Sequence, residues 1–325
     1  NAQADRILQG IVGVYEAVFP GLVAGYYVIG SYADASSVPI SDIDIVIVFG
    51  TALSNAQFGQ MNALAQHCAA ISPLRLDMLF ALRGELSGTE RTLLKIGSRC
   101  VYGSDLRGEL ELPPIGEYQR AMTWGPYRFL GQILRGQELL HYPLDYPDGA
   151  DRFFGYTQKR IPEWYPAGVE RGTKELISGV TRTATALLAL RARQYVASKG
   201  GSVRAYREHI GDAWSDYLEM LYRKGKIEWQ YAIPPNSADQ ELLHELCEQT
   251  LAFENHYFWQ YRAFLLECLH GATTDRLFAA QRLTQVVFYD AAIAEALTAN
   301  AASEDAALRE AAMQAFTFAS QSASI

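Results

Sequence analysis

The sequence has few of the residues that mark disulfide scaffolds or zinc sites. It contains four cysteines in 325 residues, no two of them in a CxxC pair, and six histidines, none of which lies four positions from another. These spacings support neither a disulfide framework nor a zinc ribbon nor a zinc site held by histidines. With so few cysteines, we expect a reducing, cytoplasmic location.

Long apolar runs and several common ligand-binding loops are also missing. No run reaches the ~18 apolar residues of a membrane span, and no basic segment followed by an apolar one indicates a secretory signal, so no membrane partner is expected. The absence of GxxxxGK, GxGxxG and GxSxG motifs leaves P-loop, dinucleotide-binding and serine-hydrolase functions without support. At 49% apolar and 20% charged residues, the chain can bury sizeable cores, and its length corresponds to about two domains.

Charge is unevenly distributed along the chain. The net charge of −8 argues against general adhesion to nucleic acid or to an anionic membrane. Residues 151–226, however, contain 14 lysines and arginines against 8 acidic residues, so the remainder of the chain is more acidic than the total suggests. A basic face of this kind would suit a polyphosphate ligand, particularly if acidic residues that bind a metal ion lay beside it. A solvated helix face with ion pairs explains the same composition equally well.

The order of apolar residues predicts a small α/β unit followed by helices. Period-two and β-branched runs predict the strands, and helical spacing predicts the helices. Residues 103–116 are rich in Gly, Pro and charge and are typical of a linker, and the Tyr-, Pro- and Gly-rich stretch 141–170 is a candidate functional loop. The expected strands are 24–29, 43–49, 74–80 and 100–102; the expected helices are 3–18, 54–70, 87–96, 117–140, 171–198, 203–223, 239–269, 275–298 and 303–319.

Residues 30–44 (GSYADASSVPISDID) hold the most informative pattern in the chain. Asp42 and Asp44 open the strand 43–49, and residues two apart on a strand point to the same face. Two carboxylates held together repel each other, so one pKa rises unless a cation lies between them. Asp77, on a strand that can lie beside 43–49, offers a third carboxylate. Three such acids suit Mg²⁺ and are typical of a two-metal phosphoryl-transfer site.

The start of the same stretch predicts a phosphate-binding turn. A strand ends at Gly30 and Ser31, and ten residues separate Ser31 from Asp42. Glycine lets the backbone approach a phosphate closely, and the following amides and the serine hydroxyl can donate hydrogen bonds to its oxygens. A phosphate cradle joined to a metal site predicts a nucleoside triphosphate as ligand.

Gly30-Ser31, the ten-residue spacing, Asp42-Ile43-Asp44 and the later Asp77 resemble the signature of the polymerase-β-like nucleotidyltransferase superfamily. The resemblance covers about residues 20–102. It implies that Gly30 and Ser31 hold the triphosphate of ATP and that Asp42, Asp44 and Asp77 are catalytic and bind two Mg²⁺ ions. It also implies an α+β fold, with a small mixed-sheet nucleotidyltransferase domain over 1–112 and an all-α helical-bundle domain over 113–325.

A single catalytic unit followed by helices is similar to the aminoglycoside (streptomycin/spectinomycin) adenylyltransferases. Residues 179–185 (GVTRTAT) and 197–201 (ASKGG) faintly resemble their Arg-bearing helix and its Gly/Lys turn, which makes Arg182 and Lys199 candidate nucleotide-binding residues. The resemblance implies transfer of a nucleoside monophosphate, AMP from ATP, to a hydroxyl of a small molecule such as an aminoglycoside.

Other functions and other residues remain open on the sequence alone. The acceptor could instead be tRNA or a protein, as in toxin–antitoxin systems, or the chain could be a nucleotide-binding regulator without catalysis. Each of Glu163, Glu170 and Glu175 is a candidate base for the acceptor hydroxyl, although a plain surface acid is the more common role.

Overall fold

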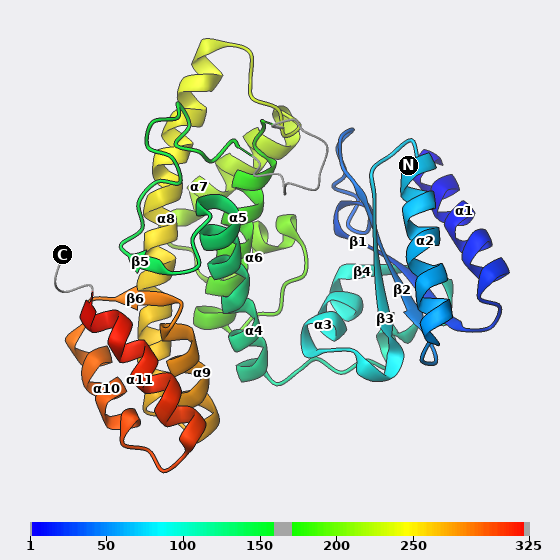
Figure 1. The fold of residues 1–325 in the computed structure, drawn as a ribbon. Coiled ribbons are helices and arrows are strands. Elements are labelled where there is room, and N and C mark those ends of the chain that lie inside the picture. Colours follow the sequence, from blue (N-terminus) through cyan, green and yellow to red (C-terminus); the bar gives the residue numbers. More distant parts are fainter. Residues whose placement is uncertain (1, 159–170, 322–325) are drawn as a thin grey trace.

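Four strands form a mixed sheet in this computed structural model, which describes residues 2–158 and 171–321. The strand order is β3-β2-β1-β4: β1 pairs antiparallel with β2 and β4, whereas β2 and β3 are parallel (Figure 1). The four strands expected from the sequence are confirmed. They are β1 (Val23–Ile29), β2 (Ile43–Phe49), β3 (Leu76–Leu82) and β4 (Ser98–Gly103).

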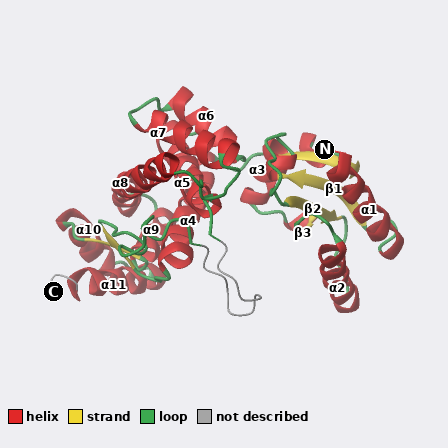
Figure 2. Ribbon diagram, turned by 90° about the horizontal axis from the view of Figure 1, so that it is seen from above, coloured by secondary structure: helices red, strands yellow, loops and turns green. Residues whose placement is uncertain are grey.

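Helices cover both faces of this sheet because β2 is apolar on both sides. Ile45 and Ile47 are buried in the cluster that includes residues of α1 and α2, while Val46 and Val48 are buried with Leu94 of α3. Figure 2 shows α3 on the side that faces the helical part of the molecule. The bounds are α1 (Ala2–Val18), α2 (Asn55–Ile71) and α3 (Gly88–Gly97).

The described residues after 112 form helices around a third apolar cluster, with one short sheet. The long α8 runs through this part, and α9, α10 and α11 gather at one end of it (Figure 1). The helical segments are α4 (Ile115–Tyr127), η4 (Arg128–Arg135), α5 (Lys174–Leu187), η5 (Leu188–Ala192), α6 (Lys199–His209), α7 (Trp214–Leu221), η6 (Tyr222–Glu228), α8 (Ser237–Leu269), α9 (Thr273–Leu283), α10 (Ala291–Ala301) and α11 (Ala306–Gln321); η4, η5 and η6 are π-helical.

The expected α+β class is confirmed, but the second part is not purely α-helical. Strands β5 (Leu140–Tyr142) and β6 (Val286–Phe288) pair in parallel. β6 interrupts the helix expected over 275–298, whereas the helix expected over 117–140 ends at Arg135, before β5 begins. The pairing joins segments far apart in the chain, so local periodicity could not predict it.

Of two other expected helices, one ends early and one is split in two. The helix expected over 171–198 ends in the π-helical η5, after which Arg193 adopts a left-handed conformation (φ 55°). The helix expected over 203–223 is split into α6 and α7 at Gly211, whose φ is +63°. A left-handed residue breaks the helical hydrogen-bond pattern, and glycine adopts it at little cost.

Apolar packing is separate in the two parts of the chain. The clusters on the two sheet faces draw their fully buried members from residues 4–106, and the helical cluster draws them from residues 127–315. A domain boundary at 112/113 fits this division and stays a prediction. All four cysteines are free thiols. Among the described helices, none is long and apolar enough to cross a membrane.

Candidate active site

Three aspartates meet at one end of the sheet, where β2 and β3 begin. Asp44 and Asp77 are register partners on these parallel strands, and Asp42 lies just before β2. One carboxylate oxygen from each of the three lies within 4.8 Å of the others. Asp44 is the only residue of β2 that is not buried, and Asp77 is exposed. The sequence prediction that these three side chains converge is therefore correct.

The environments of these acids differ. Burial raises the pKa of Asp44 to about 7, and the charges of Asp42 and Asp77 add to the effect. Burial also acts to raise the pKa of Asp42, but the hydrogen bond and positive charge of Lys174 hold that pKa below its ordinary value. A cluster in which one acid resists ionisation is one that a cation stabilises. All-oxygen ligands of this kind fit Mg²⁺, so the donor set suits the metal that the sequence predicts.

Gly30 brings the backbone directly against the acid cluster. It follows β1 with φ +67°, and a Cβ built on it would lie 2.6 Å from Oδ2 of Asp44. Gly30 and Ser31 begin a short 3₁₀ turn in which the Gly30 carbonyl accepts hydrogen bonds from the amides of Ala33 and Asp34. This turn needs both the backbone freedom and the small size of glycine.

Lysines of the helical part face the acids across one cavity. Its lining includes Gly30, Ser31, Asp42 and Asp44 on one side and Lys174, Ser198, Lys199, Lys226 and Tyr231 on the other, with Asp34, Ser36 and Ser41 at the loop between the strands. Lys174 Nζ donates to Oδ2 of Asp42 at 2.8 Å, and Lys226 Nζ donates to Oγ of Ser36 at 2.8 Å. Both contacts join the sheet part to the helical part.

The lysines repel one another in the ligand-free protein. Burial, together with the charges of Lys174, Arg182 and Lys226, lowers the pKa of Lys199 to about 8. Lys226 is only 2% exposed, and its ammonium donates hydrogen bonds to the uncharged hydroxyls of Ser36 and Tyr222. Clustered cations of this kind favour a bound polyanion.

Close contact between α5 and η6 positions the lysines. The α5 residues Lys174 and Ser178 lie one turn apart, and Ser178 Oγ accepts a hydrogen bond from Lys199 at 2.7 Å. Gly225, next to Lys226 on η6, lies so near α5 that a Cβ there would be 2.6 Å from Cδ1 of Ile177. A larger residue at 225 would push Lys226 away from the cavity.

The two basic residues expected from the sequence have different locations. Lys199 lines the cavity, and its role in nucleotide binding stays a prediction. Arg182 is absent from that lining; it lies one turn beyond Ser178 on α5, with its guanidinium 5.7 Å from the centroid of the Phe129 ring. Its charge still reaches Lys199, so its role in nucleotide binding stays a prediction.

The structure places one of the three candidate bases for the acceptor hydroxyl. Glu175 lies in the first turn of α5, and its charge acts on Arg182. Glu163 and Glu170 lie outside the described residues. A role for any of the three as base therefore stays a prediction.

Sequence reasoning missed Lys174, Lys226 and Tyr231. The only signal for the two lysines was the excess of basic residues over 151–226, and Tyr231 had none. That excess predicted a basic face without saying which side chains form it. The contacts join residues 132 and 190 positions apart, which no short motif can reveal.

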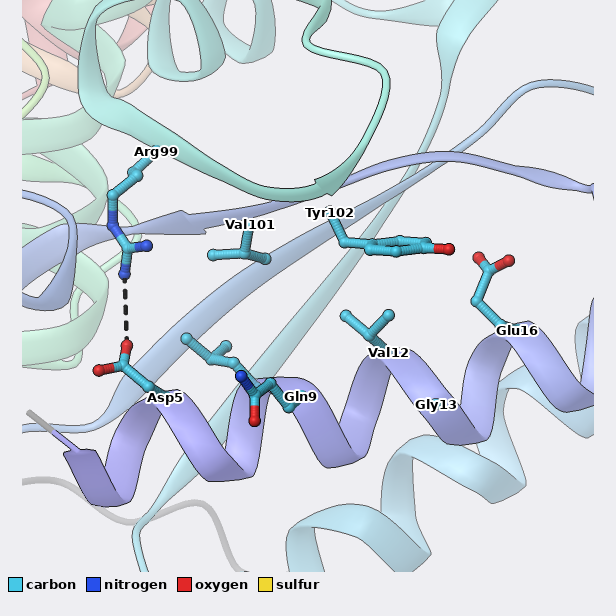
Figure 3. A pocket seen from close by; sticks show the side chains of 9 residues that line it. Asp5, Gln9, Val12, Gly13, Glu16, Arg99, Val101 and Tyr102 are labelled. Carbon is cyan, nitrogen blue, oxygen red and sulfur yellow. Dashed lines mark ion pairs between the residues drawn. The ribbon is translucent and has the colours of Figure 1, made fainter.

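A larger hollow of about 560 Å³ lies away from the acids, between α1 and β4 (Figure 3). Arg99 and Asp5 form an ion pair at one end, at 3.8 Å, and Glu16 and Tyr102 lie at the other, with Val12 and other apolar groups between them. Among the described residues, the group of acids that could hold a metal is the one at the lysine-lined cavity. Chemistry rather than size therefore identifies the candidate site.

Comparisons with known proteins give distant structural likenesses. No family model matches the sequence, and a search of curated proteins finds no significant match. Among solved structures, the chain is similar to a spectinomycin adenyltransferase, AAD(9), from Enterococcus faecialis, with 12% identity and a TM-score of 0.46 over 77% of this chain and 98% of that one. A toxin–antitoxin with AMP-PNP (19% identity, TM-score 0.27) and a mutant of the toxin–antitoxin MntA-HpeT (18%, 0.26) each match 37% of this chain and 90% of theirs.

Proposed function

We propose that the chain is a Mg²⁺-dependent nucleotidyltransferase that moves a nucleoside monophosphate, AMP from ATP, to a hydroxyl group. One observation carries the proposal: three aspartate carboxylates lie within 4.8 Å of one another, and two of them, Asp42 and Asp44, line a cavity with Gly30, Ser31 and three lysines. Acids that suit divalent cations, facing a basic wall that suits phosphates, are the two halves of a phosphoryl-transfer site.

Each group has a role in this reaction. Asp42, Asp44 and Asp77 would hold Mg²⁺, which when bound lowers the pKa of a hydroxyl and neutralises charge on phosphate oxygens. The Gly30–Ser31 turn would bind the triphosphate. Gly30 has no side chain, so the backbone there can approach the phosphates closely beside the Asp44 carboxylate. Lys199 and Lys226 would balance the charge of the leaving pyrophosphate.

The acceptor hydroxyl would form a bond to the α-phosphorus while the bond to the pyrophosphate oxygen breaks. Asp77 is the exposed member of the acid cluster, so its carboxylate would take the proton from the hydroxyl. The acidic remainder of the chain suits a cationic small molecule, and we propose an aminoglycoside as the first acceptor class to test.

Pyrophosphate release with Mg²⁺ and ATP, measured against aminoglycosides, tRNA and proteins, tests this function. We expect release with a small-molecule acceptor, and we expect Asp42→Asn and Asp44→Asn to lower it by more than about 100-fold, since the site holds several kcal/mol of charge stabilisation. Asp5→Asn, a substitution on α1, is the control and should retain activity. Near-wild-type rates in the Asp42 and Asp44 variants would contradict the assignment, and salt-sensitive release with tRNA alone would move it to a nucleic-acid acceptor.

A further inference from the structure

Lys174 forms an ion pair with one carboxylate of the acid cluster. Its ammonium lies 2.8 Å from Oδ2 of Asp42, in an ion pair whose side chains are 30% and 17% exposed. Asp42 is also one of the three residues whose oxygens could hold a metal. The contact therefore places a monovalent cation, supplied by the helical part, on a carboxylate that a metal would use.

The local structure around Lys174 does not explain this position. Lys174 is the first residue of α5, and the amino end of a helix carries a partial positive charge that disfavours a cation. Lys174 also lies close enough to Lys199 to lower the pKa of that lysine. The amino end of α5 and Lys199 both disfavour a positive charge at this position. The ion pair with Asp42 is therefore the contact that stabilises the Lys174 ammonium.

A phosphate offers Lys174 another partner nearby. The cavity that Lys174 lines also contains the Gly30–Ser31 turn, Lys199 and Lys226. A triphosphate in this cavity would give the ammonium an anion to pair with in place of Asp42, and the metal that accompanies the triphosphate would take over the carboxylate.

We propose that Lys174 is an exchangeable counter-cation: it holds Asp42 while no metal is bound and transfers to a phosphate oxygen when metal and nucleotide enter together. The inference rests on the proposed function. A bare metal ion must displace Lys174 without offering it a new partner, whereas a metal with its nucleotide does offer one. Lys174 therefore couples the two binding events, so that each ligand strengthens the binding of the other.

Titration of the full-length chain with Mn²⁺, followed through the electron paramagnetic resonance signal of free Mn²⁺, tests the coupling. Each protein is titrated with and without α,β-methylene-ATP. We expect Lys174→Met to bind bare Mn²⁺ at least fivefold more tightly than the wild type, the lower end of the ~5–150-fold range of coupling between sites. The strengthening of Mn²⁺ binding by the nucleotide should shrink by a similar factor.

Two variants make the test specific. Lys226→Met removes the same charge from the same cavity, but its ammonium contacts Ser36 and Tyr222 rather than an acid of the cluster, so bare Mn²⁺ affinity should change less than in Lys174→Met. Lys174→Arg keeps a cation at the position and should keep most of the coupling. Circular dichroism confirms that each variant folds.

The outcomes separate the two proposals. Equal shifts in Lys174→Met and Lys226→Met, or no shift in the former, would overturn the counter-cation role while leaving the metal site in place. A wild-type protein that binds Mn²⁺ neither alone nor with the nucleotide would overturn the proposed function, and the role of Lys174 with it.

Discussion

Asp44 and Asp77 are direct register partners on the parallel strands β2 and β3. On the other side of Asp44, its partner on β1 is Ile29, and Gly30 follows at once. The ends of three neighbouring strands thus bring together Asp77, Asp44 and the glycine that follows β1. The order matters because the glycine leaves open the space next to the Asp44 carboxylate.

Gly30→Ala should therefore disable the site, and the chain contains a matched control. Gly21 has nearly the same backbone conformation (φ +70° against +67°), but a Cβ there would meet nothing within 4 Å. A left-handed alanine costs roughly 1–2 kcal/mol at either position, and Gly30→Ala should lower the free energy of unfolding in urea further, because its Cβ would lie 2.6 Å from Oδ2 of Asp44. Only Gly30→Ala should abolish pyrophosphate release. Equal activity of the two variants would remove the role given to Gly30.

The raised pKa of Asp44 predicts how metal-free stability depends on pH. This pKa is about 7 in the folded protein, whereas the ordinary value for an aspartate is 3.8, so between these values the folded state binds more protons than the unfolded state. Stability should then fall as pH rises from about 4 to about 7, by about 1.4 kcal/mol for each pKa unit at most.

Melting temperatures in EDTA across this pH range measure the effect. Asp44→Asn cannot ionise, so its melting temperature should exceed that of the wild type increasingly toward pH 7. Mg²⁺ should reduce the difference in melting temperature between Asp44→Asn and the wild type. A constant difference across the range would show that Asp44 titrates as an ordinary acid.

Lys199 illustrates a conflict between stability and ligand binding. Its pKa is about 8 in the folded protein against an ordinary value of 10.5, so the folded state binds fewer protons between these values and stability should rise with pH in this window. Lys199→Met should remove this rise and raise the melting temperature at pH 7 without nucleotide. The same variant should lose the stabilisation that Mg²⁺ and ATP give to the wild type. Retention of that stabilisation would place Lys199 outside the nucleotide site.

The buried Arg135–Glu254 pair should matter for folding rather than for chemistry. Glu254 on α8 is 1% exposed and accepts from Arg135 Nη2 at 2.6 Å and from the hydroxyl of Tyr156 at 2.9 Å. Removing one member of a buried pair costs about 3–5 kcal/mol because the other charge stays uncompensated. Glu254→Leu should therefore lower the free energy of urea unfolding by this order. The double variant Arg135→Met/Glu254→Leu should recover much of the loss; an equal or larger loss would contradict this account.

How much the sequence predicted depended on the distance between the residues involved. Gly30, Ser31, Asp42 and Asp44 lie within 15 positions, so strand periodicity and spacing were enough to place them. Asp77 required only that its strand lie beside β2, which a short α/β unit makes the simplest arrangement.

The lysines and the β5–β6 pair could not be placed in this way. Lys174 meets Asp42 only because α5 packs across the cavity from the sheet, and β5 meets β6 only because the helices between them bring Leu140 beside Val286. Periodicity also missed the end of α5, where the π-helical turn η5 leads to the left-handed Arg193.

The number of residues in the π-helical turn η6 determines where Lys226 lies in the cavity. One more or one fewer residue in a helix turns every later side chain by about 100° about the axis. Deleting a single residue between Tyr222 and Lys226 would leave Lys226 in the sequence and yet move its ammonium away from Ser36. Natural variants of this protein should therefore tolerate exchanges in this turn outside Gly225 and Lys226 far better than insertions or deletions within it.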